Sequence, residues 1–255
     1  MNEKSDFALV RKPTSTVEKA APGAKRVLAG MVAETIVLAE TKALIELSPN
    51  KSPLVDSWCK KAEDYLAKYN YVEAERWFRM AADKGHAWSQ YRLSEFASRQ
   101  RDYIKAEKWV RRAAEQGLAE AQDSLARRYT TGIGVPKDDQ EALRWLNKAA
   151  EQGFAHSQHY LARFYMAGRG VPQDYHKAIL WLTKAAEQNH EFAKLRIAEC
   201  YQALDDLVEA FKWLMLASDQ NSLWEKDLNL LRPLLTKEQI AEAEKRYCEF
   251  QSSKK

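Results

Sequence analysis

The sequence predicts an all-α protein, a right-handed α/α superhelical solenoid of helix–turn–helix repeats with N- and C-terminal capping helices. Two segments carry this prediction because one is a near copy of the other, Asp138–Gln152 (DDQEALRWLNKAAEQ) and Asp174–Gln188 (DYHKAILWLTKAAEQ). Their apolar residues recur at steps of three and four, which is the spacing of one face of an amphipathic helix. No run of the chain shows the alternating, β-branched pattern of a set of strands.

Five tryptophans set the length of the repeat. They are Trp77, Trp109, Trp145, Trp181 and Trp213, so each unit is 32 or 36 residues long. An Asx position and an alanine position recur with the same steps. The longer units contain two loops that the shorter units lack, residues 131–136 (TGIGVP) and 168–172 (GRGVP). Three registers that change step together indicate a true tandem repeat.

The first fifty residues lie outside the repeat. Residues 1–22 are polar and of mixed charge, which predicts a disordered tail, and no apolar core follows the basic residues as a signal peptide requires. Residues 23–50 predict an N-terminal helix with an apolar stripe over 23–47. Charged residues interrupt this stripe, so it cannot span a bilayer. The helix either packs on the first repeat, docks elsewhere or forms a homodimer through residues 23–47, or acts as a linker.

Residues 51–221 predict the solenoid of about five units, and residues 222–255 predict C-terminal capping helices. The second helix of each unit is expected to begin at the Asx series, Asn70, Asp102, Asp138, Asp174 and Asp206. Gly85, Gly117 and Gly153 are expected to end these helices. The stretch Thr236–Gln239 (TKEQ) predicts a capping box that opens a final helix to about Phe250.

Composition narrows the class of function. Lys and Arg number 40 against 36 acidic residues, and a net charge of +4 is too weak to argue for nucleic acid. The three cysteines, Cys59, Cys200 and Cys248, are odd in number and lack the spacing of a disulfide framework. This pattern favours a reducing compartment, so the predicted location is cytoplasmic.

The units resemble the Sel-like repeat (SLR), a relative of the tetratricopeptide repeat. The resemblance is strongest over residues 121–153 and 157–189, and it covers about residues 54 to 221. The first and last units depart from the pattern, with Lys61 at a leucine position and Asn189 and Asn221 at glycine positions. The resemblance implies a non-enzymatic adaptor or scaffold of bacterial type that binds a protein or peptide partner.

Two alternatives stay open. Some disulfide-rich relatives are reported as small-molecule-binding or β-lactam-hydrolysing enzymes, but this chain lacks their paired cysteines. The other alternative is a module that assembles with itself through the N-terminal helix. No serine, cysteine or aspartate stands in a recognisable nucleophile motif, so no catalytic residue is predicted.

The candidate binding residues follow from the analogy with tetratricopeptide arrays. One register of the first helices holds Leu93, Leu125, Leu161 and Ile197. Positions five before, two before and two after these residues would face a concave groove. They are Trp88, Tyr91 and Glu95; Glu120, Asp123 and Arg127; His156, His159 and Arg163; Phe192, Leu195 and Glu199. They differ between units while the framework does not, which is how a solenoid gains specificity. Apolar ends flank a charged middle, so we expect a peptide or helix with apolar anchors.

Three sharper hypotheses concern particular groups of residues. His156 and His159 with Glu120 and Asp123 have the side-chain types of a zinc site, but a polar groove wall is the simpler interpretation, so no metal is predicted. The Gly-x-Gly loops follow a helix and lack the Lys-Ser/Thr of a phosphate loop, so no nucleotide or other cofactor is predicted. Arg127, Arg128 and Arg163 would either meet an acidic partner or form a solvated helix face.

Overall fold

The computed structural model describes residues 52–219 and 221–252. The predicted tail (1–22), the N-terminal helix (23–50) and the dimerisation segment (23–47) lie outside the described residues and stay predictions. Within the described part of the chain, no helix is both long and apolar enough to cross a bilayer.

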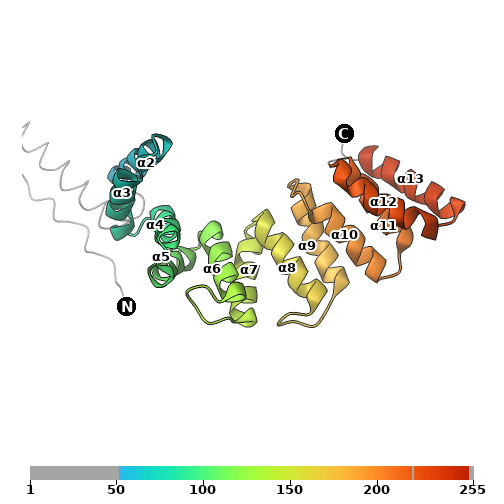
Figure 1. Cartoon of the computed structure of the whole chain (residues 1–255), viewed down its shortest axis with the longest axis horizontal. Coiled ribbons are helices and arrows are strands. Elements are labelled where there is room, and N and C mark those ends of the chain that lie inside the picture. The colour runs from blue at the N-terminus through green and yellow to red at the C-terminus, as the bar shows by residue number, and fades with distance from the viewer. Residues whose placement is uncertain (1–51, 220, 253–255) are drawn as a thin grey trace, which may run out of the picture.

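Every regular element of the described residues is a helix, and the helices form five consecutive pairs. The first helices of the pairs are α2 (Pro53–Ala67), α4 (Ala87–Arg99), α6 (Ala119–Thr131), α8 (Ala155–Ala167) and α10 (Ala193–Ala203). The second helices are α3 (Tyr71–Asp83), α5 (Tyr103–Glu115), α7 (Asp139–Glu151), α9 (Tyr175–Glu187) and α11 (Leu207–Ser218). The pairs follow one another along a curved row (Figure 1), which confirms the predicted all-α solenoid.

The predicted helix ends are present. Each Asx side chain accepts a hydrogen bond from the backbone N–H three residues on, at 2.9 to 3.2 Å, and such a cap stabilises a helix by about 1 kcal/mol. These caps are Asn70, Asp102, Asp138, Asp174 and Asp206. Gly85, Gly117 and Gly153 follow the second helices with φ of 88°, 93° and 87°, a conformation that glycine adopts at least cost.

The chain ends in a run of helices that covers α11. This run comprises η2 (Ser222–Trp224), α12 (Glu225–Leu231), η3 (Arg232–Leu234) and α13 (Lys237–Ser252). Thr236 and Gln239 form the predicted capping box, with reciprocal hydrogen bonds of 2.9 and 3.3 Å. Phe250 packs edge-on against Trp213 at 5.4 Å between ring centroids, so α13 shields the last repeat from solvent.

Alanine and tryptophan build the core between the helices. The alanine series is fully buried, at Ala74, Ala106, Ala142, Ala178 and Ala210. Trp109, Trp145 and Trp213 are buried, whereas Trp77 and Trp181 are only half-buried, so the predicted equivalence of the five indoles holds for three. Each indole also has a cation over its ring, at 4.1 Å for Lys148 on Trp145 and 4.3 Å for Lys184 on Trp181.

Three buried glutamines and three exposed ones connect neighbouring pairs, a feature that our sequence analysis missed. In α4, α6 and α8, one buried glutamine donates to a carbonyl of the preceding second helix. The same glutamine accepts from the glutamine that follows the second helix of its own pair. The donors to carbonyls are Gln90 to Ala82 (3.2 Å), Gln122 to Ala114 (3.1 Å) and Gln158 to Ala150 (3.2 Å). The partners are Gln116, Gln152 and Gln188, at 2.7, 2.8 and 3.0 Å. We call these six residues the amide relay.

The loop between α6 and α7 packs on the preceding repeat through Gly134. Its φ is 80°, and a Cβ there would lie 2.5 Å from the Tyr103 carbonyl oxygen. Gly132 has a similar φ of 77°, but its added Cβ would meet no atom closer than 3.7 Å. Both positions adopt the left-handed backbone conformation that favours glycine. Gly134 alone of the two also has no room for a side chain.

We expect Gly134→Ala to destabilise the protein more than Gly132→Ala does. Both alanines carry the backbone strain of a positive φ, about 1–3 kcal/mol, and only the first also displaces the Tyr103 backbone. Urea unfolding followed by circular dichroism measures the difference. Equal losses for the two variants would show that this loop does not press on α5.

The three thiols are free, and they differ in exposure. Cys248 is exposed, Cys59 is half-buried and Cys200 is buried. Burial raises the pKa of the Cys200 thiol to about 12, which leaves almost no reactive thiolate near neutral pH.

Alkylation without reductant should therefore label Cys248 rapidly and Cys200 only after unfolding. Mass spectrometry of the native protein should show Cys248 modified first, and all three cysteines should be modified in urea. A disulfide-linked pair in the unreduced, unfolded protein would contradict the expectation of a reducing compartment.

Candidate functional site

The twelve predicted binding residues all lie on or beside the first helices α4, α6, α8 and α10. The structure brings Asp123 and His156 into contact across two neighbouring units, and it does not expose the twelve residues equally. Asp123, His159 and Leu195 are buried, whereas Arg127, Arg163 and Phe192 are exposed. A partner lying along this surface would therefore touch some of the twelve directly and others only through their neighbours.

An aromatic pair marks the α4 end of the surface. Trp88 and Tyr91 lie 5.5 Å apart between ring centroids, and both are half-buried. The Trp88 indole donates to Glu63 Oε1 at 3.1 Å, and the Tyr91 hydroxyl donates to Glu95 Oε1 at 3.4 Å. Burial, followed by the nearby Glu95 charge, raises the pKa of Tyr91 to about 12. This pair offers a fixed apolar surface with a polar rim.

Asp123 ties α6 to α8. Its Oδ1 atom lies 2.8 Å from His156 Nδ1 and accepts a hydrogen bond from the Ser157 hydroxyl at 2.7 Å. Arg127 on the same helix lies farther away, with 3.8 Å between its Nε atom and Asp123 Oδ2. Glu120, one turn earlier, is half-buried. Asp123 is therefore engaged in joining two units.

His159 is buried and stacks on His190, with ring centroids 4.6 Å apart. Neither of its ring nitrogens has a hydrogen-bond partner in the described residues. Burial, together with His190, Arg163 and Arg196, lowers the pKa of His159 to about 3. His190 stands in the turn before α10 and was not among the predicted residues.

The histidines do not form a metal site with the carboxylates. In the ranges 52–219 and 221–252, no three or more His, Cys, Asp or Glu side chains are arranged to hold a metal ion. His156 is turned to Asp123, and His159 is turned to His190.

The α10 end of the surface is largely occupied by packing. Leu195 is 9% exposed and belongs to the core around α9 and α11. Phe192 is 39% exposed and lies edge-on to Trp224, at 6.1 Å between ring centroids. Glu199 forms an ion pair with Arg196 at 2.6 Å. Of these three residues, Phe192 presents the most apolar surface to a partner.

Three adjoining hollows follow the first helices, and arginines line all of them. The hollows have volumes of about 400, 140 and 200 Å³ in order from α4 to α10. They share Thr130 and Tyr160 at one junction and Arg163 and Ala167 at the other. Their arginines are Arg127, Arg128, Arg163, Arg169 and Arg196. We call this row of hollows the arginine groove, and only Arg127 and Arg163 of the predicted twelve line it.

The fold and the repeat define an all-α solenoid of five helix pairs. The chain belongs to the Sel1 repeat family, which matches more than half of it, over residues 63–86, 89–118, 119–154, 155–190 and 193–222. Proteins of this family are generally interaction scaffolds. Among curated proteins, none matches this chain.

A solved structure shows the same fold. A Sel1 repeat protein from Oxalobacter formigenes is 24% identical, with a TM-score of 0.60 over 74% of this chain and 84% of its own. The protective antigen c5321 of uropathogenic Escherichia coli, which displays an SLR fold, is 25% identical with a TM-score of 0.47. It covers 77% of this chain and 53% of its own length.

Proposed function

We propose that this protein is a non-enzymatic adaptor that binds a peptide or helix of a partner protein along its first helices. The observation that carries the proposal is the contrast within each unit. Caps, alanines and tryptophans repeat, whereas the predicted binding residues change from half-buried aromatic (Trp88, Tyr91) to exposed cationic (Arg127, Arg163) and back to exposed aromatic (Phe192). A constant scaffold with a variable surface is the design of solenoids that recognise extended partners.

The contacts support two apolar anchor points. Trp88 and Tyr91 form one aromatic pair, and Phe192 with Trp224 forms another at the far end of the surface. Between them, the Tyr160 ring lies beside His156 at 4.6 Å and under the Arg163 guanidinium at 5.2 Å. Aromatic and arginine side chains dominate the binding energy of protein interfaces.

The proposal predicts that Trp88→Ala/Tyr91→Ala loses a partner that the parent protein captures in a pull-down. Loss of one such anchor commonly weakens binding by about 2 kcal/mol or more, near thirtyfold. Circular dichroism should show that the variant keeps its helix content, since both side chains are only half-buried.

The matched control is Ile104→Ala/Leu180→Ala, which removes two exposed apolar side chains from second helices. Lys148 and Lys184 are unsuitable controls because they cover tryptophan rings. If the control pair loses the partner and the Trp88/Tyr91 pair keeps it, the binding surface lies on the second helices. Turnover of a small molecule by the purified protein would instead favour the enzymatic alternative.

A further inference from the structure

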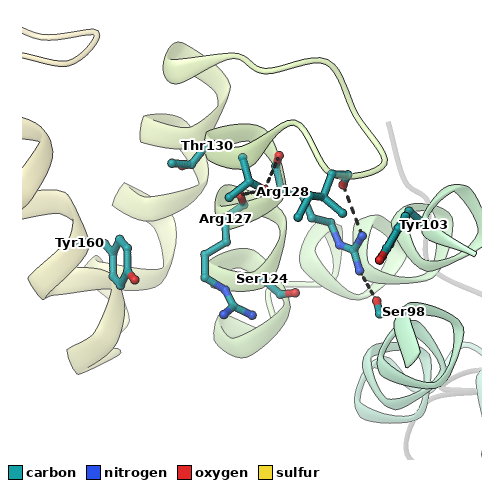
Figure 2. A pocket seen from close by; sticks show the side chains of 9 residues that line it. Ser98, Tyr103, Ser124, Arg127, Arg128, Thr130 and Tyr160 are labelled. Carbon is teal, nitrogen blue, oxygen red and sulfur yellow. Dashed lines mark hydrogen bonds between the residues drawn. The ribbon is translucent and has the colours of Figure 1, made fainter. Parts of the chain in front are cut away.

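The largest hollow of the arginine groove has the chemistry of an anion site. Its lining comes from α4 (Ser98), α5 (Tyr103), α6, the loop that follows α6 (Ile133) and α8 (Tyr160). Tyr160 and Tyr103 stand on opposite sides, with Arg127 and Arg128 between them (Figure 2). Two cations and several hydroxyls line this hollow, and none of the described lining residues is a carboxylate.

Arg128 is the unusual residue of this hollow, because it is 8% exposed and its hydrogen-bond partners among the described residues are neutral. Its Nη2 donates to Ser98 Oγ at 2.6 Å, and its Nη1 donates to the Ile133 carbonyl at 3.5 Å. Its Nε atom is buried without a partner in the described residues. The structure thus corrects one sequence-based interpretation, since Arg128 does not lie on a solvated helix face.

The carboxylate that acts electrostatically on this arginine, Glu107, is engaged elsewhere. Glu107 acts on Arg128 from a distance and binds Arg111, with 2.5 Å between Nε and Oε1. Burial and the neighbouring Arg127 charge lower the pKa of the Arg128 guanidinium. A buried cation without an anion is costly, and the C-terminal end of the α6 dipole offsets only part of that cost.

Two other arginines of the groove are paired with carboxylates. Arg169 binds Asp139 through two nitrogens, and Arg196 binds Glu199. Arg127 reaches Asp123 only at 3.8 Å, and that carboxylate already serves His156 and Ser157. Arg163 has no carboxylate partner among the described residues, and its guanidinium lies over the Tyr160 ring. The uncompensated charge is therefore carried by Arg127, Arg128 and Arg163, and the first two line the largest hollow.

We infer that this hollow holds an acidic side chain of the partner peptide, with Arg128 as the buried anchor and Arg127 as the outer cation. This inference rests on the proposed adaptor function and specifies the chemistry of its partner. A carboxylate accepts strong, charge-assisted hydrogen bonds from a guanidinium. The Ser124, Tyr103 and Tyr160 hydroxyls make no hydrogen bond within the described residues, so they can donate to the same group. The tyrosine rings and Ile133 would contact the methylene part of the side chain.

The test uses the full chain and a labelled peptide of alternating glutamate and alanine, followed by fluorescence anisotropy. Its counterpart with glutamine in place of glutamate should bind at least about tenfold more weakly, because the charged hydrogen bonds are lost. Arg128→Gln should weaken binding of the glutamate peptide by a similar factor, and Arg128→Lys should restore part of the loss. Arg144→Gln, an exposed arginine of α7, is the charge-matched control and should have little effect.

Thermal unfolding separates a binding role from a structural role. Arg128→Gln removes an uncompensated buried charge, so the midpoint of the free protein should stay the same or rise. Equal weakening by Arg128→Gln and Arg144→Gln, or equal binding of the two peptides, would overturn the inference. Binding of a phosphoserine peptide without binding of the glutamate peptide would overturn the carboxylate assignment.

Failure of the anion site can be distinguished from failure of the adaptor proposal. A captured partner that binds Arg128→Gln normally but not Trp88→Ala/Tyr91→Ala would leave that proposal standing and remove the anion site alone.

Discussion

Replacing Trp145 with alanine is expected to lower the free energy of unfolding by about 3–5 kcal/mol, the scale of large aromatic truncations in a core. The side chain is 5% exposed and packs with Leu125, Leu146 and Leu161 in the core between α5 and α8. The truncation also removes the contact of the Lys148 ammonium with the ring. Urea unfolding followed by circular dichroism provides the measurement.

Trp145→Phe is the matched variant, because it keeps an aromatic ring and removes the indole N–H. That N–H is buried without a hydrogen-bond partner in the described residues, so its removal relieves a desolvation penalty. We expect a much smaller loss than for alanine. An unfolding midpoint of Trp145→Ala that matches the parent would contradict the shared core between the third pair and its neighbours.

Lowering the pH from about 7 to 4 is expected to destabilise the protein through His159. Its pKa is about 3 in the folded protein and near 6.5 in the unfolded chain, so the unfolded state binds more protons between these values. Stability from this group is complete above pH 6.5 and falls as the pH drops toward 3. Each pH unit in that window costs up to about 1.4 kcal/mol.

His159→Phe should remove most of this pH dependence and keep the ring that stacks on His190. The groups that face His159 are His156 and Arg163 on α8, His190 in the next turn and Arg196 on α10. All four are basic, so none of them favours protonation of His159. His176→Phe, at an exposed position of α9, is the control. The same pH profile in His159→Phe and in the parent would show that other groups cause the acid sensitivity.

Periodicity was sufficient to predict the fold. The caps at Asp138 and Asp174 and the glycine at 153 follow from local rules that need no knowledge of neighbouring units. The capping box at Thr236 is equally local and was equally predictable. The amide relay was readable from the same registers, since its glutamines recur with the tryptophans, but glutamine at a helix surface carries no signal of burial by itself.

The candidate site was less predictable, because it depends on contacts between units. Arg128 is buried because Ser98 of the preceding pair and the loop carbonyl of Ile133 close over it. Among the described residues, His159 has no hydrogen-bond partner, and its ring stacks on His190 of the next unit. Helical spacing correctly assigned both residues to a helix. Which of the helix's side chains remain exposed to solvent depends on how adjacent pairs pack.

The amide relay also bears on how the array would carry load. It joins α3 to α9 through hydrogen bonds that run from one pair to the next, in addition to apolar packing. Apolar contacts slide under shear at modest cost, whereas directional amide bonds must break before adjacent helices can shift. Tension applied along the row would therefore be shared by the middle pairs, which would deform together. The spacing between their first helices, and with it their fit to a bound partner, would be kept.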